Sequence, residues 1–231
     1  MTAAFVIGYD PGGNNAHGVA SLQVQELEGR WLPLALQVTT VSTLAESVEW
    51  IKNTCRDGRI VAAGVDTLTE WNSGPAGWRP ADQWLRRTYP AIANKVVAPN
   101  ALFGSMAVNG AAFLRLLDSR FRFDDTMVTE AHPKVCLYVL TGEKHEWAVD
   151  KLALEVYLLK EIGVAAPPAG FGANDHCFDA SVGVLAALRG LNRDWTLDLH
   201  TLPTPDGVQF MGQTHYWWPP PPSVAPTRTV K

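Results

Sequence analysis

The chain has 231 residues, 47% of them hydrophobic, with no composition shift that would divide it, so we expect one globular unit with a sizeable core. Its formal net charge of -4 argues against a surface built to hold a long nucleic-acid duplex, because such binding depends mainly on Lys and Arg that neutralise phosphates. Its 3 cysteines show no CxxC pairing, which indicates neither a disulfide framework nor a standard zinc knuckle.

No segment has the features of a membrane span or an export signal. The N-terminus lacks a basic region followed by an apolar run, and no apolar stretch approaches the roughly 20 residues that cross a bilayer. We therefore expect no membrane partner and a cytoplasmic location, with which unpaired cysteines agree.

The N-terminal part predicts three antiparallel strands. Residues 3–10 (AAFVIGYD) form a short apolar run closed by Asp-Pro-Gly-Gly, as a buried strand ending in a tight turn does. Residues 17–26 and 32–41 are rich in Val, Leu and Thr and flank a Glu-Gly-Arg turn. Together these segments predict a meander.

A helix and a second buried strand follow. Thr43 and Glu46 form the capping-box pattern of a helix that ends near an Asp-Gly pair. Residues 60–66 (IVAAGVD) are an uninterrupted apolar run, typical of a strand covered on both faces. A helix followed by a buried strand implies a crossover connection.

The middle of the chain is irregular. Between Thr67 and Asn100 the segment is rich in Gly, Pro and Trp, and residues 80–87 fit a short helix with Pro at its first position. Long irregular segments of compact domains are often lids or binding loops. Residues 104–120 then have helical spacing, and residues 127–132 are strand-like.

The C-terminal part predicts two more helices and a tail. Residues 146–162 are amphipathic, and residues 172–191 form a less polar helix. No clear element is predicted for residues 194–218, and residues 219–231 (PPPPSVAPTRTVK) have the composition of a disordered tail. We expect a domain over residues 1–200 and an irregular, proline-rich extension over residues 201–231.

Two acidic residues end the two fully apolar strands. Asp10 and Asp66 each follow such a run, and ligands of open α/β sheets collect at the carboxyl ends of the strands. If the strands are parallel neighbours, the two carboxylates share one edge. The alternatives are that Asp10 forms the turn before Pro-Gly-Gly and that Asp66 is a helix cap or a loop acid.

Two further acids lie on the last helix. Asp175 and Asp179 are four residues apart and project from one face, where like charges repel. Helix capping and the macrodipole can explain Asp175. Asp179 is one turn deeper, and its face continues through Gly183, Ala186 and Gly190, small residues that would let the helix approach the sheet closely.

Clustered carboxylates raise one another's pKa, so they are stable mainly when Mg²⁺ or Mn²⁺ binds them. Two such ions about 3.5–4 Å apart activate water and stabilise the leaving oxygen in phosphodiester hydrolysis. We therefore predict a site for Mg²⁺ or Mn²⁺ whose ligands are Asp10, Asp66, Asp175 and Asp179.

The motifs GYDPGG, GVDTLTEW, WRPADQWLRR, GSMAVNGAAF, EAHPK and NDHCFDA resemble the family of predicted ribonuclease H-like nucleases filed as domain of unknown function 429, over residues 5–188. The resemblance implies an α/β fold of ribonuclease H-like type, with a mixed five-stranded sheet flanked by helices: the first three strands antiparallel, the next parallel. It implies motif acids at Asp10, Asp66 and Asp179, with Asp175 as a helix partner. The chain has Asp66-Thr67-Leu68 where the family commonly has Asp-x-Pro.

The resemblance adds residues around the acids. Its Glu-x-x-Pro element matches Glu130–Pro133 and implies a catalytic or supporting role for Glu130. On a strand, His132 would face the same side as Glu130, and it is a candidate substrate-binding group or general base. Lys134 is a further candidate for substrate binding. Alternatively, Glu130 merely ends the strand and a helix begins at Pro133.

An Arg-x-x-Asp stretch also matches, at Arg79 and Asp82. Arg79 and Arg86 are candidates for phosphate contact, although a salt bridge between Arg79 and Asp82 that holds the loop is the plainer explanation. Most of the nine tryptophans are better explained by packing than by stacking on bases, although Trp71, Trp78 and Trp84 lie in this segment and are candidates for stacking on a base.

The predicted function is that of a metal-dependent nuclease or phosphodiesterase. Its nucleophile is metal-activated water, and its substrate is nucleic acid of unspecified type. The oligomeric state is left open, with a homodimer as one candidate. A non-catalytic ribonuclease H-like binding module is one alternative. Another is an ATP-handling protein of the actin and sugar-kinase superfamily, which also opens with a strand, an Asp and glycines but normally needs two such domains. Zinc at His132 and Cys136, or at His176 and Cys177, lacks a four-ligand set.

Overall fold

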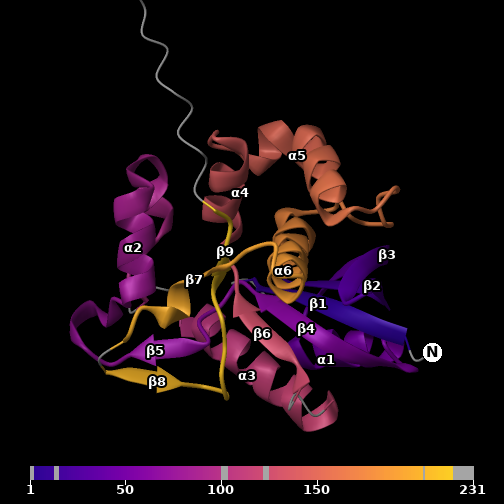
Figure 1. Cartoon of the computed structure of the whole chain (residues 1–231), viewed down its shortest axis with the longest axis horizontal. Helices are drawn as coiled ribbons and strands as arrows, with labels where there is room; N and C mark the ends of the chain where they lie inside the picture. Colours follow the sequence, from indigo (N-terminus) through magenta and orange to yellow (C-terminus); the bar gives the residue numbers. More distant parts are fainter. Residues whose placement is uncertain (1–2, 13–15, 100–103, 122–124, 205, 221–231) are drawn as a thin grey trace, which may run out of the picture.

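The computed structural model describes residues 3–12, 16–99, 104–121, 125–204 and 206–220, and a mixed sheet lies at its centre (Figure 1). The strands of the sheet are β1 (Ala3–Pro11), β2 (His17–Leu27), β3 (Arg30–Val41), β4 (Gly58–Val65) and β6 (Met127–Glu130). Their order is β3-β2-β1-β4-β6. β1 and β3 each pair antiparallel with β2, whereas β1–β4 and β4–β6 are parallel. The predicted α/β fold class, a mixed five-stranded sheet with the first three strands antiparallel and flanked by helices, is confirmed.

Helices cover both faces of the sheet (Figure 1). Alternate residues of β1 face opposite layers: Phe5 and Ile7 pack with helices α1 and α3, whereas Ala4 and Val6 belong to the core beneath α4, α5 and α6. This alternation is the period of two that a strand imposes on its side chains. The helices are α1 (Leu44–Thr54), α3 (Gly104–Phe121), α4 (Pro133–Thr141), α5 (Trp147–Ile162) and α6 (Asp175–Leu191).

Side chains cap the first turns of two of the predicted helices. Thr43 Oγ1 accepts a hydrogen bond from Glu46 N, and the Glu46 carboxylate accepts one from Thr43 N, so the capping box of α1 is present. α6 begins three residues later than predicted, because Asn174 caps it and accepts a hydrogen bond from Cys177 N.

α6 lies unusually close to the sheet. A Cβ on Gly64 would meet Gly183 O at 1.9 Å, and a Cβ on Gly8 would meet Ala180 O at 1.9 Å. The glycines thus allow direct contact between the backbones of helix and strands, as predicted for Gly183. Gly190 has another role, since a Cβ there would meet the Trp217 ring at 2.2 Å. The last residue of the predicted stripe of small residues therefore packs against Trp217.

The segment after β4 and the C-terminal segment pack together. β5 (Glu70–Asn72) pairs with β8 (Gly207–Gln209), and α2 (Pro80–Thr88) and the 3-10 helix η2 (Pro90–Lys95) complete the first segment. Next to β6, Glu130 N donates to His215 O at 2.8 Å. β9 (Trp217–Trp218) pairs with β7 (Leu197–Asp198), and Trp218 is only 1% exposed. Tyr216 and Trp218 of this C-terminal segment therefore belong to the core.

The predicted disordered tail lies mostly outside the described residues, since only residues 219 and 220 of it are described. None of the helices in the described part of the chain combines the length and apolar character needed to cross a bilayer.

Candidate functional site

Three of the predicted acids lie at the carboxyl edge of the parallel strands. Asp10 is the penultimate residue of β1, and Asp66 follows the last residue of β4. The amide of Asp66 donates to Tyr9 O at 2.9 Å, which ties the two strand ends together. Asp179 lies in the second turn of α6, the helix that packs across β1 and β4. The fold thus brings together carboxylates from three distant parts of the chain.

Their electrostatics show that these acids act on one another. Burial is the main cause that raises the pKa of each, and Asp10 and Asp179 are only 4% and 8% exposed. The charge of Asp10 raises the pKa of both Asp66 and Asp179 further. A carboxylate that is buried among others is unfavourable as an anion unless a cation neutralises it.

Asp175 lies at the margin of this cluster. It is partly exposed in the first turn of α6, where Asn174 already caps the helix. Its charge nevertheless raises the pKa of Asp10 and of Asp179. Asp175 is therefore close enough to act on the cluster, whatever it contributes to the helix terminus.

Lys134, in the first turn of α4, is the cation that faces these acids. It is exposed, and its charge lowers the pKa of Asp10, Asp66 and Asp179. One ammonium cannot by itself balance three carboxylates.

His176 is a site residue that the sequence interpretation missed. Its Nδ1 lies 2.5 Å from Asp10 Oδ2, and this hydrogen bond is the main cause that raises the pKa of His176. Nearby, Tyr9 Oη and His17 Nδ1 form a buried hydrogen bond of 2.8 Å. The only available signal was the spacing on α6, where His176 precedes Asp179 by three residues and so lies on a neighbouring face.

The donor set of the cluster matches a hard divalent cation, because Mg²⁺ and Mn²⁺ prefer carboxylate oxygens. Within the described ranges, however, no group of three or more His, Cys, Asp and Glu side chains is arranged so that it could hold a metal ion. One visible reason is that Asp10 Oδ2 is already paired with His176. Metal binding thus requires the carboxylates to reorient.

Glu130 belongs to a separate buried network. It accepts hydrogen bonds from Thr69 N at 2.6 Å and from Arg79 Nη1 at 2.6 Å, and His200 Nε2 lies 3.3 Å away. Burial alone would raise the pKa of Glu130, but Arg79 and His200 outweigh burial and hold it below its ordinary value. The Glu130 carboxylate is therefore hydrogen-bonded to other protein groups. Its charge acts on the acidic cluster by raising the pKa of Asp66.

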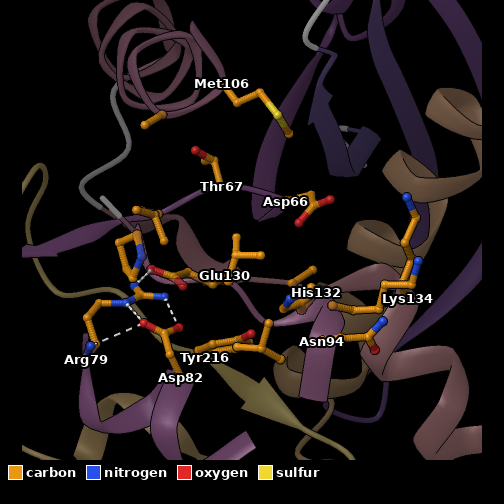
Figure 2. Close-up of a pocket in the computed structure, with 17 residues that line it drawn as sticks. Asp66, Thr67, Arg79, Asp82, Asn94, Met106, Glu130, His132, Lys134 and Tyr216 are labelled. Atoms are coloured by element: carbon orange, nitrogen blue, oxygen red, sulfur yellow. Dashed lines mark hydrogen bonds and ion pairs between the residues drawn. The ribbon is translucent and has the colours of Figure 1, made fainter. Parts of the chain in front are cut away.

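Arg79 is at the centre of this network and is 1% exposed. Its Nε and Nη2 donate to the two carboxylate oxygens of Asp82, each at 2.9 Å. Figure 2 shows Arg79, Asp82 and Glu130 joined on one side of a pocket, with Asp66 and Lys134 on the other. The salt bridge that was the plainer explanation of the Arg-x-x-Asp motif is thus present.

Arg86 also has protein partners. Its Nη1 donates to Ala93 O at 2.7 Å and to Val96 O at 2.6 Å, and its guanidinium lies over the Trp78 ring at 5.2 Å. Trp84 packs edge-on against Tyr89. Both tryptophans therefore support packing rather than an open stacking platform.

His132 precedes Pro133, the first residue of α4, so the alternative that a helix begins there is confirmed. Burial lowers the pKa of His132 to about 4, and the imidazole is neutral at pH 7. His132 lines the same pocket as Asp66 and Lys134, which has a volume of about 310 Å³.

No known protein family matches this sequence, and no curated protein does.

Proposed function

We propose that this chain is a metal-dependent phosphodiesterase of the ribonuclease H-like superfamily that cleaves nucleic acid, with Asp10, Asp66 and Asp179 as ligands of Mg²⁺ or Mn²⁺. The observation that carries the proposal is the convergence of three carboxylates, the buried Asp10 and Asp179 and the partly buried Asp66, at the carboxyl edge of the parallel strands. Ligands of open α/β sheets bind at this edge. The raised pKa values of the acids support a cation as the missing partner.

In this proposal the residues of the site have separate roles in metal binding, phosphate binding and orientation. Bound Mg²⁺ or Mn²⁺ supplies activation of water and stabilisation of the leaving oxygen. Asp10 and Asp66 are held by the strand ends, and Asp179 by the close contact of α6 with the sheet. Lys134 is the exposed cation that can hold a phosphate next to Asp66. Asp175 can contribute a further oxygen from the rim, and His176 orients Asp10.

A cleavage panel tests this proposal. Single-stranded, duplex, hybrid and branched DNA and RNA substrates are incubated with the full chain and Mg²⁺, Mn²⁺ or EDTA. We expect metal-dependent cleavage of at least one substrate and a loss of more than about 100-fold in Asp10→Asn, since groups that only support a metal ligand are already worth roughly 10–100-fold.

The matched control is Asp57→Asn, an exposed acid directly before β4, at the opposite end of that strand from Asp66. It is expected to cleave like the wild type. Equal activity in Asp10→Asn would contradict the proposal. Nucleic-acid binding without cleavage by any metal would instead support the non-catalytic binding module.

A further inference from the structure

The pocket beside Asp66 is built by six parts of the chain, of which Arg79 and Asp82 at α2 and Tyr216 before β9 have been described with the buried network or the C-terminal segment, and four form the rest. These are the loop after β4, the segment around η2, the start of α3 and the connection from β6 to α4. Figure 2 shows Asp66, Met106, Asn94, His132 and Lys134 among the residues that line it. Its volume of about 310 Å³ is at the small end of the range for ligand pockets, roughly 300–1,000 Å³. A flat ligand with one ring system matches this size class.

One part of the pocket wall is aliphatic, beside the charged residues that also line it. Leu68, Val96 and Ala131 are buried, and Met106 and Ala107 of α3 complete the lining. None of these side chains offers a charge. Aliphatic walls of this kind favour the faces of a planar heterocycle, which enzymes hold between apolar or aromatic side chains when a base leaves its stack.

Two polar side chains of the lining can pair with the edge of such a ring. Asn94 carries one amide donor group and one carbonyl acceptor, and a neutral imidazole such as that of His132 carries one donor and one acceptor. In the described part of the chain, neither side chain has a hydrogen-bond partner, although both line the pocket. Unused donors and acceptors beside an apolar slot are the arrangement that recognises a base edge.

The pocket is continuous with the acidic site. Asp66 and Lys134 line it, and both also take part in the electrostatics of the acidic cluster. A nucleotide whose phosphate lies at Lys134 would therefore direct its base into the pocket. The walls are fixed in advance, because Arg86 holds the carbonyls of Ala93 and Val96, and such preorganisation favours binding.

We propose that this pocket binds one unpaired nucleobase next to the phosphodiester, so that the substrate is single-stranded or locally unpaired nucleic acid. The inference rests on the proposed function for its choice of a nucleotide ligand. A base within a duplex reaches such a pocket only after unstacking, which costs a few kcal/mol. The net charge of -4 agrees, because the chain lacks the excess of cations that duplex binding uses.

Calorimetric titration of the full-length Asp10→Asn variant in EDTA tests the pocket without hydrolysis. The probes are the four nucleoside 5′-monophosphates, with ribose 5-phosphate as the base-free probe. At least one nucleotide is expected to bind at least tenfold more tightly than ribose 5-phosphate. In the Asp10→Asn background, the further substitution Ala107→Phe fills the pocket and is expected to weaken nucleotide binding at least tenfold. Added Val108→Phe is the matched control, since Val108 is the next residue of α3 and is 68% exposed.

A second variant, Asn94→Ala, removes a side chain that is exposed and keeps the test valid if Ala107→Phe does not fold. It is expected to weaken nucleotide binding about tenfold. A single-stranded oligonucleotide should displace the bound nucleotide, and a fully paired duplex should not. Equal binding of ribose 5-phosphate, unchanged affinity in the pocket variants, or equal displacement by the duplex would overturn the inference.

The outcomes also separate this inference from the proposed function. Base-dependent binding without cleavage by the wild type under any metal would mean that the hydrolytic function is wrong and the pocket stands. If Ala107→Phe and Asn94→Ala instead cleave single strands at the wild-type rate in the presence of metal, the hydrolytic function stands and the base-binding pocket is wrong.

Discussion

Arg79→Met removes the cation of the buried network and leaves two carboxylates without their partner. Arg79 donates to Asp82 at 2.9 Å through two nitrogens and to Glu130 at 2.6 Å, and it is 1% exposed. The Met side chain has a comparable length and no charge, so the volume of the site is largely kept. The change therefore isolates the loss of the ion pairs.

The expected loss is large for a single substitution. Removing one partner of a buried ion pair costs about 3–5 kcal/mol, because the remaining charge is buried without compensation. In a domain of 150–250 residues each kcal/mol lowers Tm by roughly 2–4 °C, so we expect a fall of roughly 6–20 °C. The control is Arg30→Met, whose salt bridge with Asp194 is 55% and 23% exposed and should be worth less than about 1 kcal/mol.

The pH dependence gives this prediction a second readout. The folded protein holds the pKa of Glu130 below its ordinary value, so the stabilisation is present above the unfolded pKa and is lost as the pH falls through the folded pKa. In Arg79→Met the largest part of this support is gone and only that of His200 remains, so the deficit should be largest near pH 7 and shrink below pH ~4, where an ordinary Glu is protonated. Thermal unfolding followed by circular dichroism measures both. A deficit at pH 7 no larger than that of Arg30→Met would refute the reasoning.

Two further predictions concern α6. Gly64→Ala would place a Cβ 1.9 Å from Gly183 O. Because the backbone must then move, we expect the free energy of unfolding, measured with denaturant, to fall by about 3 kcal/mol. The control is Gly212→Ala, whose Cβ would meet nothing within 4 Å, and equal losses in the two variants would contradict the close helix contact. Asp179→Asn should stabilise the metal-free protein by on the order of 1 kcal/mol at pH 7, because the raised pKa of Asp179 makes its ionisation unfavourable in the folded state. The gain should vanish in acid, below the ordinary Asp range, and a loss of Tm at pH 7 in EDTA would argue against a repulsive acidic cluster.

The sequence was sufficient for the elements that carry a local pattern. Apolar runs predicted β1 and β4, the capping box at Thr43 predicted the start of α1, and the acids after the two runs fell at the same edge of the sheet because the strands are parallel neighbours. In each case a signal of a few adjacent residues decides the structure.

Long-range pairings could not be predicted in this way. His176 and Asp10 are 166 positions apart, and only the packing of α6 on β1 brings them together. The C-terminal strands are two or three residues long, too short for a period, so nothing marked Trp218 as core. Glu130 and Arg79 were predicted as catalytic and phosphate-binding groups from motifs that carry no information on their 2.6 Å contact; those roles remain predictions.

Calorimetric titration with Mn²⁺ tests the central claim, the metal site at Asp10, Asp66 and Asp179, most directly. The wild type and the exposed-acid variant Asp57→Asn should bind Mn²⁺ alike, and Asp10→Asn and Asp179→Asn should each bind at least tenfold more weakly, since each removes an anionic oxygen ligand. The absence of Mn²⁺ binding by the wild type, or affinities unchanged in both site variants, would contradict the claim.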